Sequence, residues 1–196
     1  MSVNRLSVIS FALLASAAAV VQHPHWSYEG AGGPSHWGTL DAAFHTCDVG
    51  KHQSPISIHD ATPADLPAIN FSYQPSPLTL IDNGHTIQAI YAPGSFITVK
   101  DHKYELQQFH FHHPAEEVVN GKSYPMVAHL VHKDAAGKLA VVAVLLDEGQ
   151  ANAVVQTVWK HLPTAKQMEN ELAPAGVKVD AAGLLPAQCA AAAAAE

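Results

Sequence analysis

The stretch Gln107-Gln108-Phe109-His110-Phe111-His112 decides the fold, together with Met126-Val127-Ala128-His129-Leu130-Val131-His132 farther along the chain. In an extended strand, side chains at positions i and i+2 point to the same face. The two histidines of the first stretch therefore project together, and its phenylalanines face the other way. Asn120-Gly121 lies between the stretches and is a strong hairpin signal. The pattern predicts two antiparallel strands that bring His129 beside the first histidine pair.

Three imidazoles that converge in this way would suit a zinc ion. His110, His112 and His129 would leave the fourth position of a tetrahedral zinc to water, which is typical of a catalytic site. A chain with 14 histidines contains about one His-x-His by chance. His23-Pro24-His25 is a second instance, with no strand pattern around it. The Phe/His alternation, the turn and the third histidine in another apolar strand favour a metal site over coincidence.

The rest of the chain is dominated by short apolar runs separated by turn residues. They cover residues 69–73, 78–81, 86–90, 96–99, 107–112, 126–132 and 139–146. Strands at this spacing predict a mainly β domain of the α+β class, with a central, twisted and largely antiparallel sheet. The run at 139–146 is apolar on both faces, which predicts a central strand.

Helices are expected to be few, short and peripheral. Val154, Val155, Val158 and Trp159 have helical spacing, and Pro163 follows as a stop, so we expect a helix over residues 151–162. The segment 26–38 is rich in Gly, Pro, Trp and Tyr, which predicts irregular packed structure.

Length and charge narrow the class of protein. The 196 residues are enough for one domain with a substantial core. The formal net charge of −7 argues against nucleic acid as a partner. Nothing in these properties indicates an oligomeric state.

The N-terminus has the composition of a secretory signal peptide. Arg5 precedes the apolar run 8–14, and small residues follow at 15–19. We therefore expect residues 1–21 to be cleaved, and the protein to be periplasmic or secreted with no stable membrane insertion afterwards. An uncleaved membrane anchor is the alternative, since only cleavage separates the two.

The motifs together resemble the α-class carbonic anhydrases, and the bacterial branch in particular. The shared motifs are QFHFH (108–112), AHLVH (128–132), His36-Trp37-Gly38, the run 50–56, Asn83-Gly84-His85 and the run 120–126. They follow in the family's order from about Trp26 to about Pro163. The resemblance implies the same fold and a Zn²⁺ cofactor. It also implies reversible hydration of carbon dioxide to bicarbonate and a proton, by zinc-bound hydroxide with a histidine proton shuttle.

The resemblance also implies roles for residues around the metal. His85 matches the proton shuttle, Gln108 the residue that supports the first histidine, and Glu116 a buried glutamate that orients the hydroxide. The remaining matches are Tyr28, Asn83 and Gln88 for a water network, and Val131 and Val141 for the carbon dioxide pocket. Without the resemblance, His85 would be an exposed loop residue, Glu116 a surface turn residue, and the valines ordinary core.

The chain departs from the family at three places. Val127 stands where the family often has a glutamate that supports His129. Cys47 lacks its usual Thr-Thr-Pro-Pro-Cys partner, so a bridge to Cys189 is doubtful. Past Leu184-Leu185-Pro186 an alanine-rich tail (187–196) replaces a long family segment, so residues 22–186 are expected to form an incomplete domain. The alternative function is therefore a truncated zinc-binding homologue with little or no activity.

Overall fold

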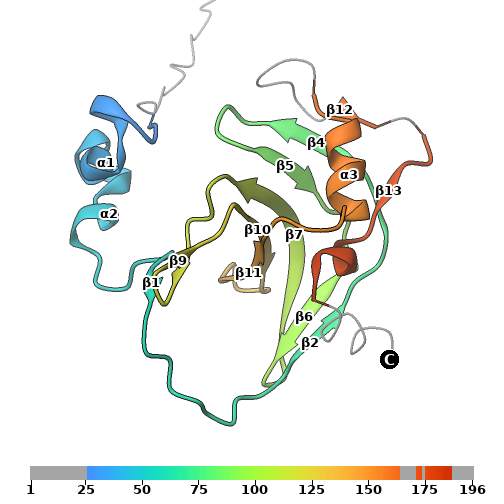
Figure 1. Ribbon diagram of the computed structural model, residues 1–196, viewed down its shortest axis with the longest axis horizontal. Coiled ribbons are helices and arrows are strands. Elements are labelled where there is room, and N and C mark those ends of the chain that lie inside the picture. Colours follow the sequence, from blue (N-terminus) through green and yellow to red (C-terminus); the bar gives the residue numbers. More distant parts are fainter. Residues whose placement is uncertain (1–25, 164–170, 174, 187–196) are drawn as a thin grey trace, which may run out of the picture. The chain divides into compact units, whose positions relative to one another are not determined.

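The two histidine strands lie side by side in an eight-stranded sheet (Figure 1). Its strand order is β11-β10-β7-β5-β4-β12, β6 pairs with both β7 and β2, and every pairing is antiparallel. The strands are β2 (Ile69–Ser72), β4 (Thr79–Asp82), β5 (Ile87–Ile90), β6 (Phe96–Val99), β7 (His102–His112), β10 (Met126–Lys133), β11 (Leu139–Leu146) and β12 (Glu171–Leu172). The predicted mainly β fold with a largely antiparallel sheet is confirmed.

The computed structural model describes residues 26–163, 171–173 and 175–186. The predicted signal segment, Cys189 and the alanine-rich tail lie outside these residues. The chain divides into two units, Met1–Lys51 and His52–Glu196, and each is described by itself below. None of the helices within the described residues has the length and apolar character needed to cross a membrane.

The predicted turn at Asn120-Gly121 is present, but it closes a smaller hairpin. Both residues have positive φ, 50° and 79°, as a two-residue type I′ turn requires. The turn joins β8 (Val118–Val119) to β9 (Lys122–Ser123), and β8 also pairs in parallel with β1 (Ser57–Ile58). This hairpin is inserted between β7 and β10, which are nevertheless antiparallel neighbours as expected.

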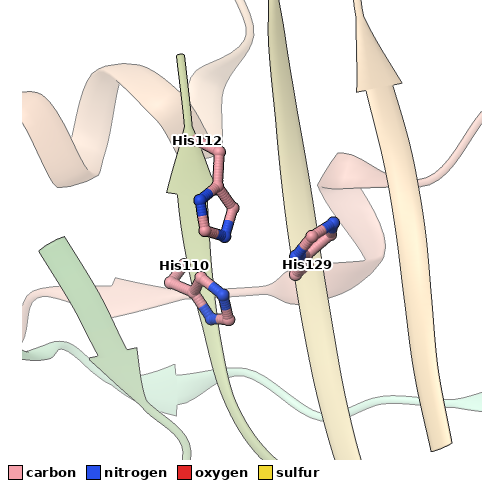
Figure 2. Close-up of side chains that lie close together, drawn as sticks. All are labelled: His110, His112 and His129. Atoms are coloured by element: carbon pink, nitrogen blue, oxygen red, sulfur yellow. The ribbon is translucent and has the colours of Figure 1, made fainter. Parts of the chain in front are cut away.

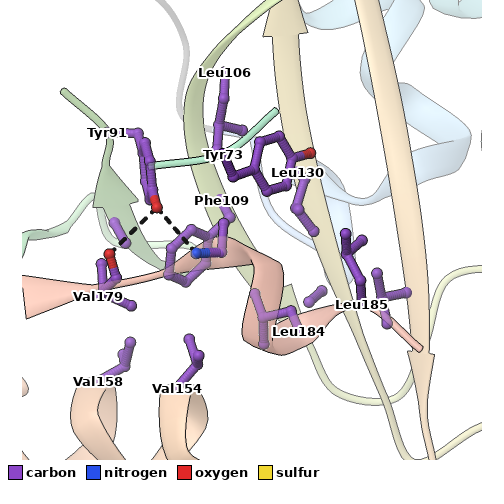
Figure 3. Packing of buried hydrophobic residues seen from close by; sticks show 14 of the residues in the cluster. Tyr73, Tyr91, Leu106, Phe109, Leu130, Val154, Val158, Val179, Leu184 and Leu185 are labelled. Carbon is purple, nitrogen blue, oxygen red and sulfur yellow. Dashed lines mark hydrogen bonds between the residues drawn. The ribbon is translucent and has the colours of Figure 1, made fainter. Parts of the chain in front are cut away.

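One face of the large sheet carries the hydrophobic core (Figure 3). Phe109 and Leu130 of β7 and β10 are fully buried there. The core is covered by the helix α3 (Ala153–Lys160), by β13 (Lys178–Val179, paired with β3, Ser76–Pro77) and by the 3-10 helix η4 (Ala181–Leu184). The hydroxyl of Tyr91 lies 3.2 Å from the Val179 carbonyl and accepts a hydrogen bond from the Ala181 N–H at 3.0 Å.

The helix α3 is shorter than the predicted range. Its first turn is capped by Asn152, whose side chain accepts hydrogen bonds from the N–H groups of Val154 and Val155. Val154 and Val158 are buried against the sheet. The predicted helix is therefore confirmed, with the cap fixing its start at Ala153.

The prediction that residues 139–146 form a central strand is wrong for the described part of the chain. Within it β11 pairs only with β10 and forms an edge of the sheet. Leu139 and Val141 are 64% and 53% exposed, whereas Val144 on the other face is buried. The apolar run has a core face and an open face, and the sequence pattern alone does not distinguish this from burial on both sides.

The N-terminal unit consists of short helical turns around an aromatic cluster. Its elements are η1 (Gly30–Gly32), η2 (Pro34–His36), α1 (Trp37–Leu40), η3 (Ala42–Phe44) and α2 (Thr46–Val49). Trp26, Tyr28 and Trp37 pack edge to face, with ring centroids 5.3 to 6.0 Å apart. The Trp37 indole donates to the carbonyls of Ser27 and Gly32. This matches the predicted irregular packed segment; Cys47 in α2 is an exposed free thiol.

Candidate metal centre

Three histidines converge on the face of the sheet opposite the core (Figure 2). His110 and His112 come from β7, and His129 is the direct register partner of His110 on β10. One nitrogen from each ring lies within 4.8 Å of the other two. The alternation of β7 produces this grouping, because Phe109 and Phe111 occupy the intervening positions on the core face.

The environment favours neutral imidazoles. Burial and, to a smaller extent, the neighbouring His112 and His129 together lower the pKa of His110 to about 4. Burial also lowers the pKa of His112, although the nearby Glu116 opposes this. Metal binding requires unprotonated imidazoles, so these shifts prepare the site for a cation near neutral pH.

Hydrogen bonds fix which nitrogen of two rings is available. The His110 Nδ1–H donates to Gln108 Oε1 at 2.9 Å, which leaves the Nε2 lone pair for a ligand. The His129 Nε2–H donates to Glu117 Oε1 at 2.7 Å, which leaves Nδ1. Such partners set the tautomer and the ring orientation of metal-binding histidines.

Glu116 lies at the same centre. Its Oε1 is 3.4 Å from His112 Nδ1, and its Oε2 is 3.9 Å from His129 Nδ1. The side chain is 25% exposed, so it is neither a surface turn residue nor a fully buried one. The structure thus brings Glu116 and Gln108 to the histidines.

The histidines open into a cavity of about 550 Å³. Its lining combines polar groups with an apolar wall: Ser54, Pro55, Ile56, Ile58, His110, His112, Glu116, Glu117, His129, Val141 and Ala143. Val141 and Ala143 come from the open face of β11, which explains part of their exposure. A small uncharged molecule would meet apolar side chains on one side and the histidines on the other.

The remaining residues to which the resemblance assigned a role lie on neighbouring strands, in a turn and in the N-terminal unit. Gln88 on β5 is the register partner of His110, and Val131 on β10 pairs with Val141. His85 lies half-buried in the turn between β4 and β5. The Asn83 side-chain oxygen accepts hydrogen bonds from the N–H groups of His85 and Thr86, and so holds that turn. Tyr28 belongs to the N-terminal unit, and its predicted role is untested.

A zinc ion fits the donor set. Around a tetrahedral zinc with Zn–N bonds near 2.0–2.1 Å, the ligating nitrogens lie about 3.3 Å apart. Small side-chain rotations bring nitrogens that are within 4.8 Å of each other to this spacing. One further observation supports a cation: within the described part of the chain, Glu117 Oε2 is buried with no hydrogen-bond partner. A carboxylate in that position is stabilised by positive charge nearby.

Sequence reasoning missed Glu117. The residue precedes a two-residue strand and shows no periodicity that would assign it to the centre. Its only sequence signal is indirect: Val127 stands where the family often has a glutamate, which leaves the partner of His129 open to a backbone carbonyl, a water or another side chain.

Comparisons with known proteins agree with this geometry. Residues 32–191 match the family of eukaryotic-type carbonic anhydrases. The chain is 37% identical over 176 residues to a carbonic anhydrase of Pectobacterium carotovorum, covering 89% of this chain and 72% of that protein.

Two solved structures are similar in fold and sequence. One is a hyperthermostable carbonic anhydrase from a hydrothermal vent chimney, with a TM-score of 0.78 and 42% identity over 83% of this chain and 72% of that one. The other is the α-carbonic anhydrase of Thermovibrio ammonificans in complex with the inhibitor sulfanilamide, with a TM-score of 0.78 and 37% identity over 84% of this chain and 72% of that one. Together with the family match, they establish that the chain belongs to the α-carbonic anhydrase family.

Proposed function

We propose that the protein catalyses the reversible hydration of carbon dioxide to bicarbonate and a proton. The observation that carries the proposal is the convergence of three histidines at a cavity with an apolar wall. Family membership agrees with this reaction. A small molecule is thus the only partner that the proposal requires.

In this proposal His110, His112 and His129 hold a zinc ion through His110 Nε2, His129 Nδ1 and one nitrogen of His112. When bound, zinc would act as a Lewis acid and lower the pKa of a coordinated water to about 7. This value is the one characteristic of carbonic anhydrases as a class. Three neutral ligands leave the charge of the metal uncompensated, which favours this effect.

The residues of the chain supply positioning and exclusion of water. Gln108 and Glu117 hold two of the rings by hydrogen bonds. Glu116, beside His112 and His129, is placed to accept a hydrogen bond from a group at the metal. Val141 and Ala143 provide an apolar wall on which carbon dioxide can lie.

His85 is the proposed carrier of the proton to solvent. Histidine is the side chain most often used to carry protons near neutral pH, which is what this step requires. Its turn is anchored to β7, since the Thr86 hydroxyl donates to the carbonyl of Phe111, between His110 and His112, at 2.6 Å. This hydrogen bond ties the turn that carries His85 to the part of β7 that lies between two of the histidines.

The test measures bound zinc and carbon dioxide hydration in the same samples. Purified protein is expected to hold one zinc per chain, and alanine at His110, His112 or His129 to lower both zinc content and activity. His45→Ala, at an exposed position of the N-terminal unit, is the matched control. Unchanged zinc in all three site variants would refute the ligand assignment. Full zinc without hydration would instead favour the alternative of a non-catalytic zinc-binding homologue.

We also propose that residues 1–21 direct export, so that the mature protein is periplasmic or secreted. The support is the order of a basic residue, a short apolar run and small residues. N-terminal sequencing of protein made in a secreting host is expected to find a start shortly after Ala17 to Ala19, close to Gln22. An intact Met1 on protein retained in the membrane would contradict this.

A further inference from the structure

Glu117 is held in place by main chain on both sides. The Ala115 N–H donates to the Tyr124 carbonyl at 3.0 Å. Val118 pairs with Ser123 of β9 and with Ser57 of β1. The side chain of Glu117 is only 14% exposed. Its carboxylate therefore approaches the sheet from a fixed backbone, as second-sphere partners of metal ligands require.

The carboxylate of Glu117 accepts a hydrogen bond from the outer nitrogen of His129. Glu117 Oε1 accepts from Nε2–H at 2.7 Å, which places the proton on Nε2 and turns Nδ1 toward the other histidines. Val127 precedes His129 by two positions, so it lies on the same face of β10 and is fully buried. A valine side chain cannot accept a hydrogen bond, so the strand itself offers His129 no such partner at that position.

We propose that Glu117 is the positioning residue for His129: it sets the tautomer and orientation of this ring for metal binding, in place of an acceptor on β10. The inference rests on the proposed function, since it deepens the role of the same centre. Glu117 thus supports His129 from the segment that leads into the inserted hairpin. Gln108, in contrast, supports His110 from within the same strand.

The second carboxylate oxygen supports this assignment. Glu117 Oε2 is buried and has no hydrogen-bond partner among the residues that the structure describes. A positive charge nearby stabilises a buried carboxylate that lacks full pairing. A divalent cation held by Nδ1 of His129 would supply such a charge. The pair is then a carboxylate–histidine–metal arrangement.

The experiment has one readout that needs no metal. In zinc-free protein, ¹⁵N-edited NMR of the imidazole rings is expected to show His129 as the Nε2–H tautomer. Glu117→Ala removes the acceptor and should shift His129 toward a mixture of tautomers. Glu117→Gln keeps an acceptor oxygen but loses the charge, so it should retain the tautomer.

The second readout is zinc affinity, measured by competition with a chromophoric chelator. Loss of a second-sphere partner costs about 10–100-fold in metal affinity, which is the effect expected for Glu117→Ala. Glu117→Gln should fall between it and the wild type. Val127→Glu in the Glu117→Ala background places a carboxylate on the same face of β10 and should restore part of the affinity. Glu148→Gln, at an exposed turn, is the matched control.

The two readouts separate this inference from the proposed function. Zinc affinity of Glu117→Ala within twofold of wild type, with an unchanged His129 tautomer, would overturn the role of Glu117. Wild-type protein that binds zinc but does not hydrate carbon dioxide would refute the proposed function and leave the positioning role intact. If Glu117→Ala does not fold, the intermediate zinc affinity of the isosteric Glu117→Gln carries the test, and wild-type affinity there would overturn the proposal.

Discussion

A buried histidine in the core should make the stability of this protein depend on pH. His132 on β10 is fully buried on the core face. Its Nδ1–H donates to the Ala140 carbonyl at 3.2 Å, so Nε2 accepts the hydroxyl proton of Tyr73 at 2.7 Å. Both ring nitrogens are therefore satisfied in the neutral form, and a second proton would displace the Tyr73 hydrogen bond.

The expected loss of stability follows from the pKa. Burial lowers the pKa of His132 from 6.5 to about 4, against a smaller opposing effect of the Ala140 and Leu130 carbonyls. At a pH between these two pKa values, His132 is protonated in the unfolded chain but stays neutral in the folded chain. The free energy of unfolding therefore falls as pH falls. At about 1.4 kcal/mol per pKa unit, the loss is about 2 kcal/mol at pH 5 and about 3 kcal/mol at pH 4.

Urea unfolding from pH 7 to pH 4, with a chelator present to remove metal, measures this loss. The double variant Tyr73→Phe/His132→Leu replaces both partners by apolar groups, so it should fold at pH 7 and lack this part of the pH dependence. Contributions of the other histidines cancel in the comparison, and His45→Gln is the control. An equal fall in stability for the double variant and the wild type would refute the reasoning.

Three further outcomes are expected. Tyr73→Phe alone leaves His132 Nε2 without its donor in the core, so it should lower the free energy of unfolding at pH 7 by about 1–3 kcal/mol in urea titrations. Asn152→Ala removes the cap of α3 and should cost about 1 kcal/mol by the same assay, with wild-type stability contradicting the role of the cap. His85→Ala should slow carbon dioxide hydration mainly in weak buffer, and imidazole-type buffers should restore part of the rate; equal rates at all buffer concentrations would exclude His85 as the proton carrier.

The sequence was sufficient where local periodicity decides the outcome. The alternation of Phe109, His110, Phe111 and His112 predicted one apolar and one polar face, and the structure has both. Asn120-Gly121 predicted a turn, because few other pairs tolerate positive φ at both positions. The position of β11 could not be predicted, since it depends on which strands pair with it.

The sequence predicted the histidines of the centre and the two strands that carry them, but not the acidic residue that contacts His129. His129 is the register partner of His110, which follows once two antiparallel strands are assumed. Glu117 reaches the same point from a loop and a short hairpin, and its contact with His129 depends on tertiary structure. The pairing of Tyr73 with His132, 59 positions apart, is equally invisible to local patterns.

Stopped-flow carbon dioxide hydration by protein with a known zinc content tests the central claim most directly. We expect a rate above that of buffer, proportional to the fraction of chains that carry zinc, and lost when His110, His112 or His129 is replaced by alanine. Protein that holds one zinc per chain at these histidines, but hydrates carbon dioxide no faster than buffer, would contradict the account.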